Sequence, residues 1–233
     1  MATMIPMTRR TALGLVLAGV AATALPARAH AAGEEEQVLV DKAKEAVQLI
    51  RSDPDYKKMN ELLARSHGAM VVPELVKAGF ILGGEGGRAV LLRRDDQNGQ
   101  WTYPAFYDFG GGSIGLQAGI QKSQVILVFM TKKGLELAMT DKMKFGADAS
   151  IVVATIGGGA EAATTTNLDA DIYAFAKSEG LFGGISLEGS AIIPDQDANQ
   201  AYYGTRYTSR QIIYEGKGAN AGAEGLRLAL AAP

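Results

Sequence analysis

The spacing of apolar residues predicts helices at the start of the chain. In residues 34–51, apolar side chains recur every three or four positions between charged ones, which is typical of an amphipathic helix. Asp53 and Pro54 then suit the N-cap and first position of a second helix, which is expected to run to about Ser66. Both helices are expected to pack on a core. The acidic residues 34–36 favour a helix N-terminus and disfavour an anionic membrane surface.

The middle of the chain changes to patterns that are typical of strands. Apolar and polar side chains alternate strictly over residues 113–121, and residues 125–130 form an apolar run that suits a central strand. Residues 83–87 and 97–100 predict hairpin turns, and residues 110–112 predict a break between strands. Further strands are expected at residues 101–109, 149–156, 172–176 and 185–193, and helices at 131–139, 195–203, 209–214 and 223–230.

This order of elements predicts an α+β fold, because strands dominate the middle and helices the two ends. Glycines inside the predicted strands, such as Gly115 and Gly119, let a sheet bend sharply or let another backbone approach closely. Tight bending is what a small barrel requires. We therefore expect a curved, largely antiparallel sheet or partly closed barrel, flanked by N- and C-terminal helices.

The first 31 residues have the pattern of an export signal. Arg9 and Arg10 precede the short apolar residues 11–25, and the small-residue patterns in residues 27–31 fit cleavage of a signal peptide. The paired arginines resemble a twin-arginine signal, although the general secretory route stays open. A retained membrane anchor is the alternative, but the apolar segment is shorter than the about 20 residues that span a bilayer.

Cleavage after residue 31 predicts a single domain over residues 32–233, periplasmic or secreted. The chain has no cysteine, which removes disulfides, thiolate chemistry and a lipidated N-terminus. Removal of residues 1–31 lowers Lys and Arg from 23 to 20 while Asp and Glu stay at 25, so the net charge becomes about −5. Such a chain lacks the basic character of nucleic-acid-binding proteins, and no nucleic-acid partner is expected.

Several separated motifs resemble the SYLF domain family. The resemblance covers about residues 42–215 and includes the glycine-rich strand at 110–117. Family members are lipid-binding domains: eukaryotic members bind phosphoinositides, a fungal branch also binds actin, and bacterial members are exported. The resemblance implies binding of an anionic or phosphoinositide-like lipid. It does not extend to actin, because no additional actin-related module is found. The motifs are residues 69–73, 77–80, 83–88, 101–106, 110–117, 178–189 and 202–204.

A site for anionic lipid requires positive charge beside apolar surface. Each basic residue near an anionic membrane contributes about 1 kcal/mol. The four basic residues from Lys77 to Arg94 are expected to converge if the strands on either side of residues 83–87 pair as a hairpin. Lys132 and Lys133, at the start of the helix expected at residues 131–139, form a second cluster. For any single residue, an ordinary solvated charge is the simpler interpretation. The predicted lipid-binding residues are Lys77, Arg88, Arg93, Arg94, Lys132 and Lys133.

The residues that catalysis needs are scarce. His67 is the one histidine beyond the predicted signal peptide, so neither a histidine pair for zinc nor a convincing triad is available. The glycine-rich residues 83–87 lack the ending of a P-loop. Asp169 and Asp171 lack the rest of a calcium loop.

The sequence therefore predicts a non-enzymatic binding protein with no metal and no cofactor. Its expected partner is an anionic lipid or membrane surface, and its protein partner is unknown. Two alternatives stay open. One is a structural or protein-interaction protein of the cell envelope without a lipid ligand, and the other is an enzyme acting on lipid or cell-wall material.

Overall fold

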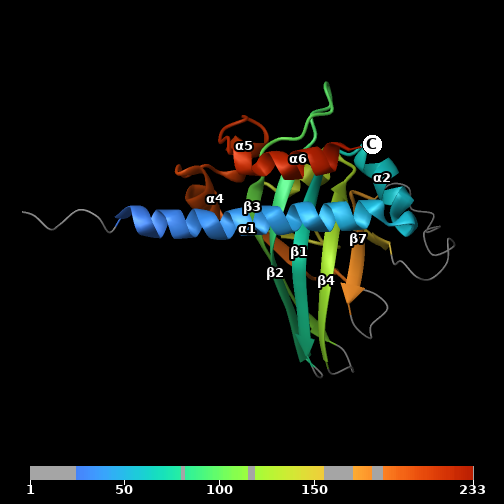
Figure 1. Ribbon diagram of the computed structural model, residues 1–233. Coiled ribbons are helices and arrows are strands. Elements are labelled where there is room, and N and C mark those ends of the chain that lie inside the picture. Colours follow the sequence, from blue (N-terminus) through green and yellow to red (C-terminus); the bar gives the residue numbers. More distant parts are fainter. Residues whose placement is uncertain (1–24, 80–81, 115–118, 155–169, 180–185, 233) are drawn as a thin grey trace, which may run out of the picture.

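The computed structural model describes residues 25–79, 82–114, 119–154, 170–179 and 186–232. A curled eight-stranded sheet forms a half-barrel, with helices at both ends of the chain, which confirms the α+β prediction (Figure 1). Neighbouring strands, in the order β5-β8-β3-β2-β1-β4-β7-β6, are antiparallel except for the parallel pair β6 and β7. The strands are β1 (Gly68–Gly79), β2 (Leu82–Arg93), β3 (Ala105–Ile114), β4 (Gly119–Phe129), β5 (Met143–Lys144), β6 (Ile151–Ala154), β7 (Ile172–Glu179) and β8 (Ala191–Pro194).

The N-terminal helices follow their local sequence. Helix α1 (Leu25–Ser52) begins nine residues before the predicted start at residue 34, so the acidic residues 34–36 lie inside it rather than at its N-terminus. Asp53 accepts a hydrogen bond from the backbone N–H of Asp55 and caps a short 3-10 helix, as expected. The remaining helices are η1 (Pro54–Tyr56), α2 (Lys57–Leu63), α3 (Lys132–Leu137), α4 (Gln196–Tyr203), α5 (Ser209–Ile213), η2 (Ala221–Ala223) and α6 (Glu224–Ala231).

Two of the predicted turns lie inside strands. The glycine-rich residues 83–87 belong to β2, and residues 110–112 belong to β3, so neither run breaks its strand. These glycines face one another across the two strands: Gly84 pairs with Gly112 and Gly86 with Gly110. They are part of paired, extended strands and do not reverse the chain. The two ends of the strand predicted over residues 113–121 belong to different strands, β3 and β4, and residues 115–118 lie outside the described residues.

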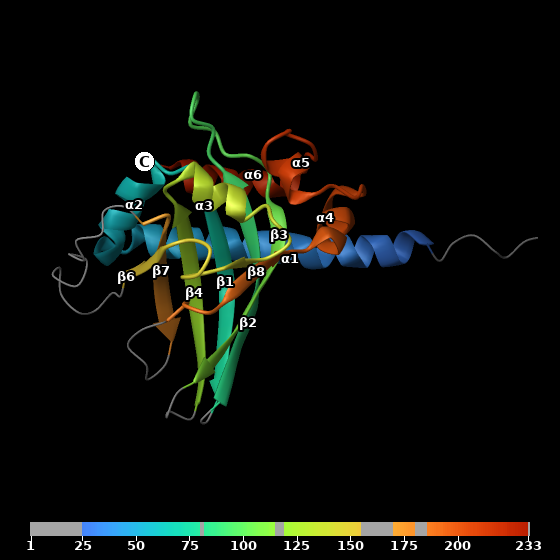
Figure 2. The same ribbon diagram turned by 180° about the vertical axis from the view of Figure 1, so that it is seen from behind.

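The sheet is covered on both faces over one half of its length. Helix α1 crosses one face, which we call the α1 face. Helix α3 lies on the opposite face, and the curl of the sheet brings its strand β8 over that face as well (Figures 1 and 2). Val71, Val90 and Ile126 are fully buried on the α1 face, where α1, α2, α4 and α6 complete the core. Strands β1, β2 and β4 extend beyond α1 (Figure 1), so their far halves lie outside this layered region.

Local caps bound the C-terminal helices. Asp195 caps α4 by accepting a hydrogen bond from the backbone N–H of Ala198, and Gly204 ends this helix at a φ of 70°. Thr208 and Gln211 form a capping box at the start of α5. The strand predicted at residues 185–193 is confirmed only in its last part, as β8. Between residues 155 and 169 the predictions lie outside the described residues.

Candidate functional site

The structure separates the basic residues that were expected to converge. Strands β1 and β2 are antiparallel, with Lys77 opposite Glu85 and Arg93 opposite Gly68. Lys77 therefore lies near one end of the pair and Arg93 at the other, while Arg88 lies between them. The expected convergence does not occur.

A second group does meet at the end of the sheet where β2 finishes. Lys132 at the start of α3 contacts Asp96 at 3.1 Å, and Asp96 in turn lies 2.9 Å from the Nδ1 atom of His67. The hydrogen bond from Lys132 lowers the pKa of Asp96. Arg93 and Arg94 lie at the same end of the sheet. The carboxylates there, Asp95 beside Arg93 and Asp96 beside Lys132, offset part of the positive charge.

Carboxylates partner five of the six predicted lipid-binding residues. These contacts reduce the positive charge that each residue offers to an anion. Their role in lipid binding is untested and stays a prediction. The ion pairs are Lys77 with Glu85 at 3.8 Å, Arg88 with Glu36 at 2.5 Å, Arg93 with Asp95 at 3.8 Å, Lys132 with Asp96 at 3.1 Å, and Lys133 with Asp171 at 4.0 Å.

A groove runs between α1 and the part of the sheet that extends beyond it. Its larger part has a volume of about 590 Å³ and is lined by residues of α1 and of strands β1, β2 and β3, with apolar side chains that include Val38, Leu39 and Val76. A smaller part, of about 200 Å³, lies further along α1. Both parts include Pro73 and Glu74, so they are two sections of one groove, which we call the α1 groove.

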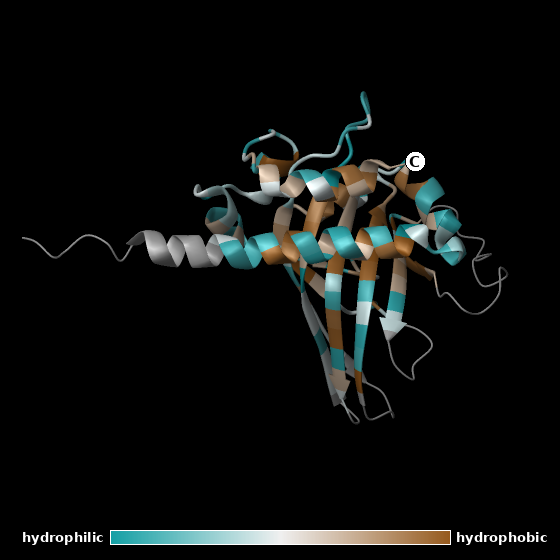
Figure 3. Ribbon diagram, in the orientation of Figure 1, coloured by the Kyte–Doolittle hydropathy of each residue, from teal (hydrophilic) through white to brown (hydrophobic). Residues whose placement is uncertain are grey.

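Helix α1 leaves two large apolar side chains exposed along this groove. Val38 lines the larger part and is 54% exposed, and Leu49 lines the smaller part and is 45% exposed. Their spacing of eleven residues is close to three helical turns, so both lie on one side of α1. Apolar and polar positions alternate along this helix (Figure 3). An apolar side chain that stays exposed beside a groove gains free energy when a ligand covers it.

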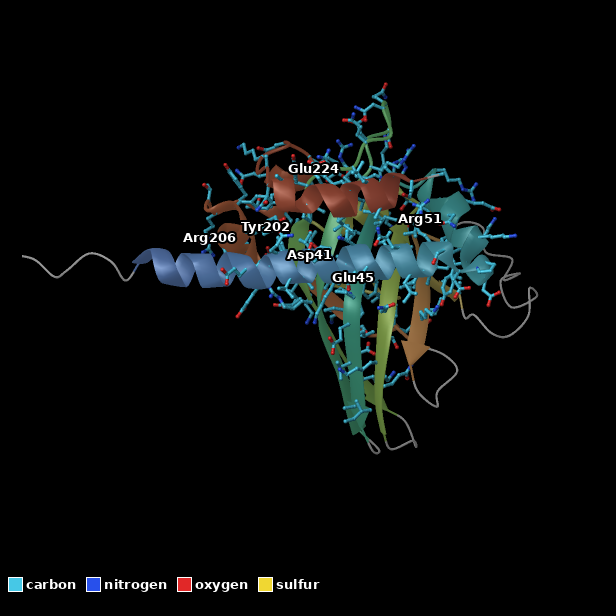
Figure 4. The ribbon with its side chains drawn as sticks, in the orientation of Figure 1. Asp41, Glu45, Arg51, Tyr202, Arg206 and Glu224 are labelled. Carbon is cyan, nitrogen blue, oxygen red and sulfur yellow. The ribbon has the colours of Figure 1, made fainter. Side chains whose placement is uncertain are left out.

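The other side of α1 is fixed to the C-terminal helices. The guanidinium of Arg51 donates a hydrogen bond of 2.8 Å to the carbonyl oxygen of Leu230 in α6, and the Tyr202 hydroxyl in α4 donates one of 3.1 Å to the Gln37 side chain. Figure 4 shows Arg51 and Tyr202 at opposite ends of the region where α1 runs alongside these helices. The helix is thus held in place from one side while its other side borders the groove.

A bulge in β1 shapes the middle of the groove. The pairing of β1 with β4 shifts register between Val72 and Leu75, so Pro73 and Glu74 form an irregular step inside a central strand. Proline has no N–H to donate to the ladder and is confined to such places. In β2, a Cβ on Gly87 would lie 2.5 Å from the carbonyl oxygen of Glu74. The sequence signal for the groove was a proline that directly follows two strand residues.

Glu74 links α1 to the sheet at the point where the two parts of the groove meet. Its carboxylate lies 3.5 Å from the Lys42 ammonium on α1 and 2.8 Å from the Lys122 ammonium on β4. The hydrogen bond from Lys122, with the charges of both lysines, lowers the pKa of Glu74. All three side chains are about half exposed, so each pair contributes no more than about 1 kcal/mol.

Acidic side chains gather around Arg88 at one end of the groove. Arg88 contacts Glu36 on α1 at 2.5 Å and Asp195 at 3.7 Å, and it pairs across the strands with Asp108. Glu36 is only 4% exposed, and its Oε2 atom has no hydrogen-bond partner among the described residues. Burial and the charge of Asp195 raise the pKa of Asp108, with Arg88 opposing them. Glu35 also lines this end.

The described residues around the groove offer apolar and acidic side chains. Across the part of the chain that the structure describes, no three His, Asp or Glu side chains are grouped so that they could hold a metal ion. None of the helices in those residues is both long and apolar enough to cross a membrane. The groove combines exposed apolar side chains with an acidic end, which suits a polypeptide ligand.

Comparison with known proteins identifies relatives over much of the chain. The sequence model of the family described as "Ysc84: Las17-binding protein actin regulator" matches residues 110–232. LAS seventeen-binding protein 3 of Saccharomyces cerevisiae is 30% identical over 156 residues, which are 66% of this chain and 34% of the relative. SH3 domain-containing YSC84-like protein 1 of Xenopus laevis is 29% identical over 155 residues, 66% of this chain and 46% of the relative. The chain thus spans between a third and a half of these relatives.

These comparisons correct the partner prediction. The relatives are named for Las17 binding and for SH3 domains, and not for a lipid. The prediction named an anionic lipid or membrane surface as the partner and left the protein partner unknown. The names of the relatives point to protein partners instead, so this prediction is wrong. Ion pairs supply the physical reason, because carboxylates partner five of the six predicted lipid-binding residues.

The predicted periplasmic or secreted location is also wrong by these comparisons. The relatives are yeast and vertebrate proteins whose names refer to Las17 binding or to SH3 domains. In the structure, α1 runs without interruption from Leu25 through the predicted cleavage region at residues 27–31. That region is rich in alanine, the strongest helix former. The rest of the predicted signal peptide, residues 1–24, lies outside the described residues.

Proposed function

The chain belongs to the Ysc84 family, whose description is that of Las17-binding actin regulators, and from this we propose that it is a non-enzymatic module that binds a partner protein. Names among its relatives refer to binding of Las17, and we extend protein binding as such to this chain. The division into a single domain over residues 32–233 remains part of this proposal. Because the chain spans less than half of these relatives, their other activities are not carried over.

The observation that supports this proposal best is the pair of exposed apolar side chains along the α1 groove. Full burial of a valine or leucine side chain contributes about 1.5–3 kcal/mol. Val38 and Leu49 are about half exposed, so covering both with a ligand contributes roughly the value for one such side chain. Eleven residues of helix separate them, or about 16 Å. An extended segment of about five residues spans that length.

The shape of the groove favours a segment of a partner protein over a flat protein surface. The groove lies between a helix and a sheet and has a total volume of several hundred Å³ in two sections. A single side chain or a short peptide enters such a space, whereas a flat surface would touch only its rim. Insertion of a peptide into a preformed apolar groove is an established mode of recognition.

Lipid binding, which the SYLF resemblance implies, stays a prediction. The groove supports it less directly, because the acidic side chains around Arg88 repel an anionic headgroup. The test of the proposed function therefore includes liposomes as a separate arm.

The proposal is tested with a variant that changes only the exposed side chains of the groove. Val38→Asp/Leu49→Asp places two charges on α1 without touching its buried face, and Leu228→Asp on α6 is the matched control, because Leu228 is 68% exposed outside the groove. The full-length wild-type chain, the groove variant and the control are each fused to a proximity-labelling enzyme in cells that produce the protein naturally. We expect a set of proteins that the wild type and the Leu228 variant label and the groove variant does not.

The same three proteins are sedimented with neutral and with anionic liposomes at low and high salt. Identical labelling by all three proteins would overturn the proposed groove. Selective, salt-sensitive pelleting with anionic liposomes, together with no groove-dependent protein, would replace protein binding by lipid binding.

A further inference from the structure

We propose that the α1 groove selects a partner segment in which a lysine or arginine lies next to an apolar side chain. This inference rests on the proposed function and specifies the chemistry of the partner. The basic side chain would bind at the acidic end of the groove. We define this end by Glu35 and Asp108, which line the groove, and by Glu36 and Asp195, which contact the lining residue Arg88.

The acidic end has more carboxylates than its own cation can neutralise. Among the described side chains, Glu36 and Asp195 contact the Arg88 guanidinium, Asp108 pairs with Arg88 across the strands, and Glu35 lines the groove near them. Arg88 forms its shortest contact with Glu36, at 2.5 Å, and a longer one with Asp195, at 3.7 Å. Lys42, the other base that lines this part of the groove, pairs with Glu74 at 3.5 Å. A positive charge brought by a ligand would therefore meet an unbalanced negative field.

Two observations at individual side chains support this imbalance. The Oε2 atom of Glu36 is buried and has no hydrogen-bond partner within the described part of the chain, although a buried carboxylate oxygen normally has one. The pKa of Asp108 is raised, because burial and the charge of Asp195 outweigh the attraction of Arg88. A bound ammonium or guanidinium would stabilise the charged form of Asp108 and supply the missing charge.

The apolar part of the groove lies directly beside this acidic end. Val38, Leu39 and Val76 line the same section as Glu35, Arg88 and Asp108. In an extended segment, neighbouring side chains point to opposite sides, so one can enter the apolar section while the next reaches the groove edge. The ion pairs of Glu74 with Lys42 and Lys122 lie at the other end of this section and carry no comparable excess of negative charge.

A random nine-residue peptide library displayed on phage, selected against the full chain, tests this specificity. We expect the enriched peptides to contain lysine or arginine next to leucine, isoleucine, valine or phenylalanine. Asp108→Asn/Asp195→Asn removes two charges of the acidic end. Asparagine keeps the N-cap of α4 at position 195, so the variant should stay folded. The matched control, Asp197→Asn, removes an exposed charge on α4 that pairs with Arg206 and belongs to no ion pair of Arg88.

The affinity of an enriched peptide, made synthetically, should fall by roughly tenfold in the Asp108/Asp195 variant, and the loss should shrink at high salt. The Asp197 variant should bind it like the wild type. Enriched peptides that lack basic residues, or equal affinity for both variants, would refute the basic preference while leaving the groove proposal intact. Failure of the proposed function would give a different result. In that case, Val38→Asp/Leu49→Asp would not weaken the binding of any enriched peptide.

Discussion

Gly87→Ala tests whether the β1 bulge and its facing glycine form one unit. A Cβ at position 87 would lie 2.5 Å from the carbonyl oxygen of Glu74 and 3.2 Å from Cγ1 of Val72. The first contact is with backbone, so a rotamer change cannot relieve it, and the bulge at Pro73 must move. Overpacking of this kind costs about 1–3 kcal/mol. In a chain of 233 residues, that corresponds to a melting temperature lowered by roughly 2–12 °C.

The matched control is Gly112→Ala in the neighbouring strand. A Cβ at position 112 meets nothing within 4 Å, so the substitution is expected to be neutral or slightly stabilising through the unfolded chain. Both variants are unfolded with urea and with heat, and the free energies of unfolding are compared. If Gly87→Ala were as stable as Gly112→Ala, the close approach of β2 to the bulge would have no energetic role. The bulge at Pro73 and Gly87 would then not form one unit.

Three further predictions follow from the ion pairs and caps. Arg88→Met leaves Glu36 buried without a cation and should lower the free energy of unfolding by about 3–5 kcal/mol, whereas the double variant with Glu36→Leu should recover much of this loss; chemical denaturation of the singles and the double gives the coupling. Asp195→Ala removes the cap of α4 and should cost about 1 kcal/mol, and Asp195→Asn should cost less. Because the pKa of Glu74 is lowered in the folded state, its carboxylate stabilises the fold at a pH above its ordinary titration range, and this stability is lost as the pH falls through the folded-state pKa. Glu74→Gln should therefore flatten the acid side of a curve of unfolding free energy against pH. At neutral pH it should lower that free energy by no more than about 1 kcal/mol.

Local hydrogen bonds explain which parts of the fold could be predicted from the sequence. Asp53, Thr131 and Asp195 each accept a hydrogen bond from a backbone N–H two or three residues further along the chain. A cap of this kind depends only on its own neighbourhood, so its position is readable in one sequence. The apolar run at residues 125–130 was likewise sufficient to place a central strand, since β4 lies between β1 and β7.

The glycine-rich segments show where prediction from local sequence ends. A run such as residues 83–87 suits a turn equally well as a closely packed strand. The difference lies in the partner: Gly86 faces Gly110, and Gly87 faces the bulge at Glu74. These partners are more than ten residues away along the chain, and no local pattern identifies them.

The ion pairs show the same limit for the candidate site. Arg88 and Glu36 are 52 residues apart, and the sequence assigned them to unrelated roles, one in lipid binding and one at a helix N-terminus. Their contact makes Arg88 an internal counterion of α1. The apolar residues Val38 and Leu49 also looked like ordinary helix positions, because periodicity does not show which side of a helix remains uncovered. Pro73 was the one local signal of the groove, since a proline within a strand requires an irregular ladder.

The position of Arg88 also decides which charge the groove can accept. A guanidinium surrounded by solvent would attract an anion, but here Glu36, Asp108 and Asp195 surround it. Its field is cancelled at short range, and the surplus carboxylates determine the potential at the groove entrance. The same residue that suggested an anionic ligand in the sequence therefore belongs to the site for which we propose a cationic one. Replacing the neighbouring carboxylates, rather than Arg88, is the way to reverse the preference, because loss of Arg88 would also remove the buried partner of Glu36.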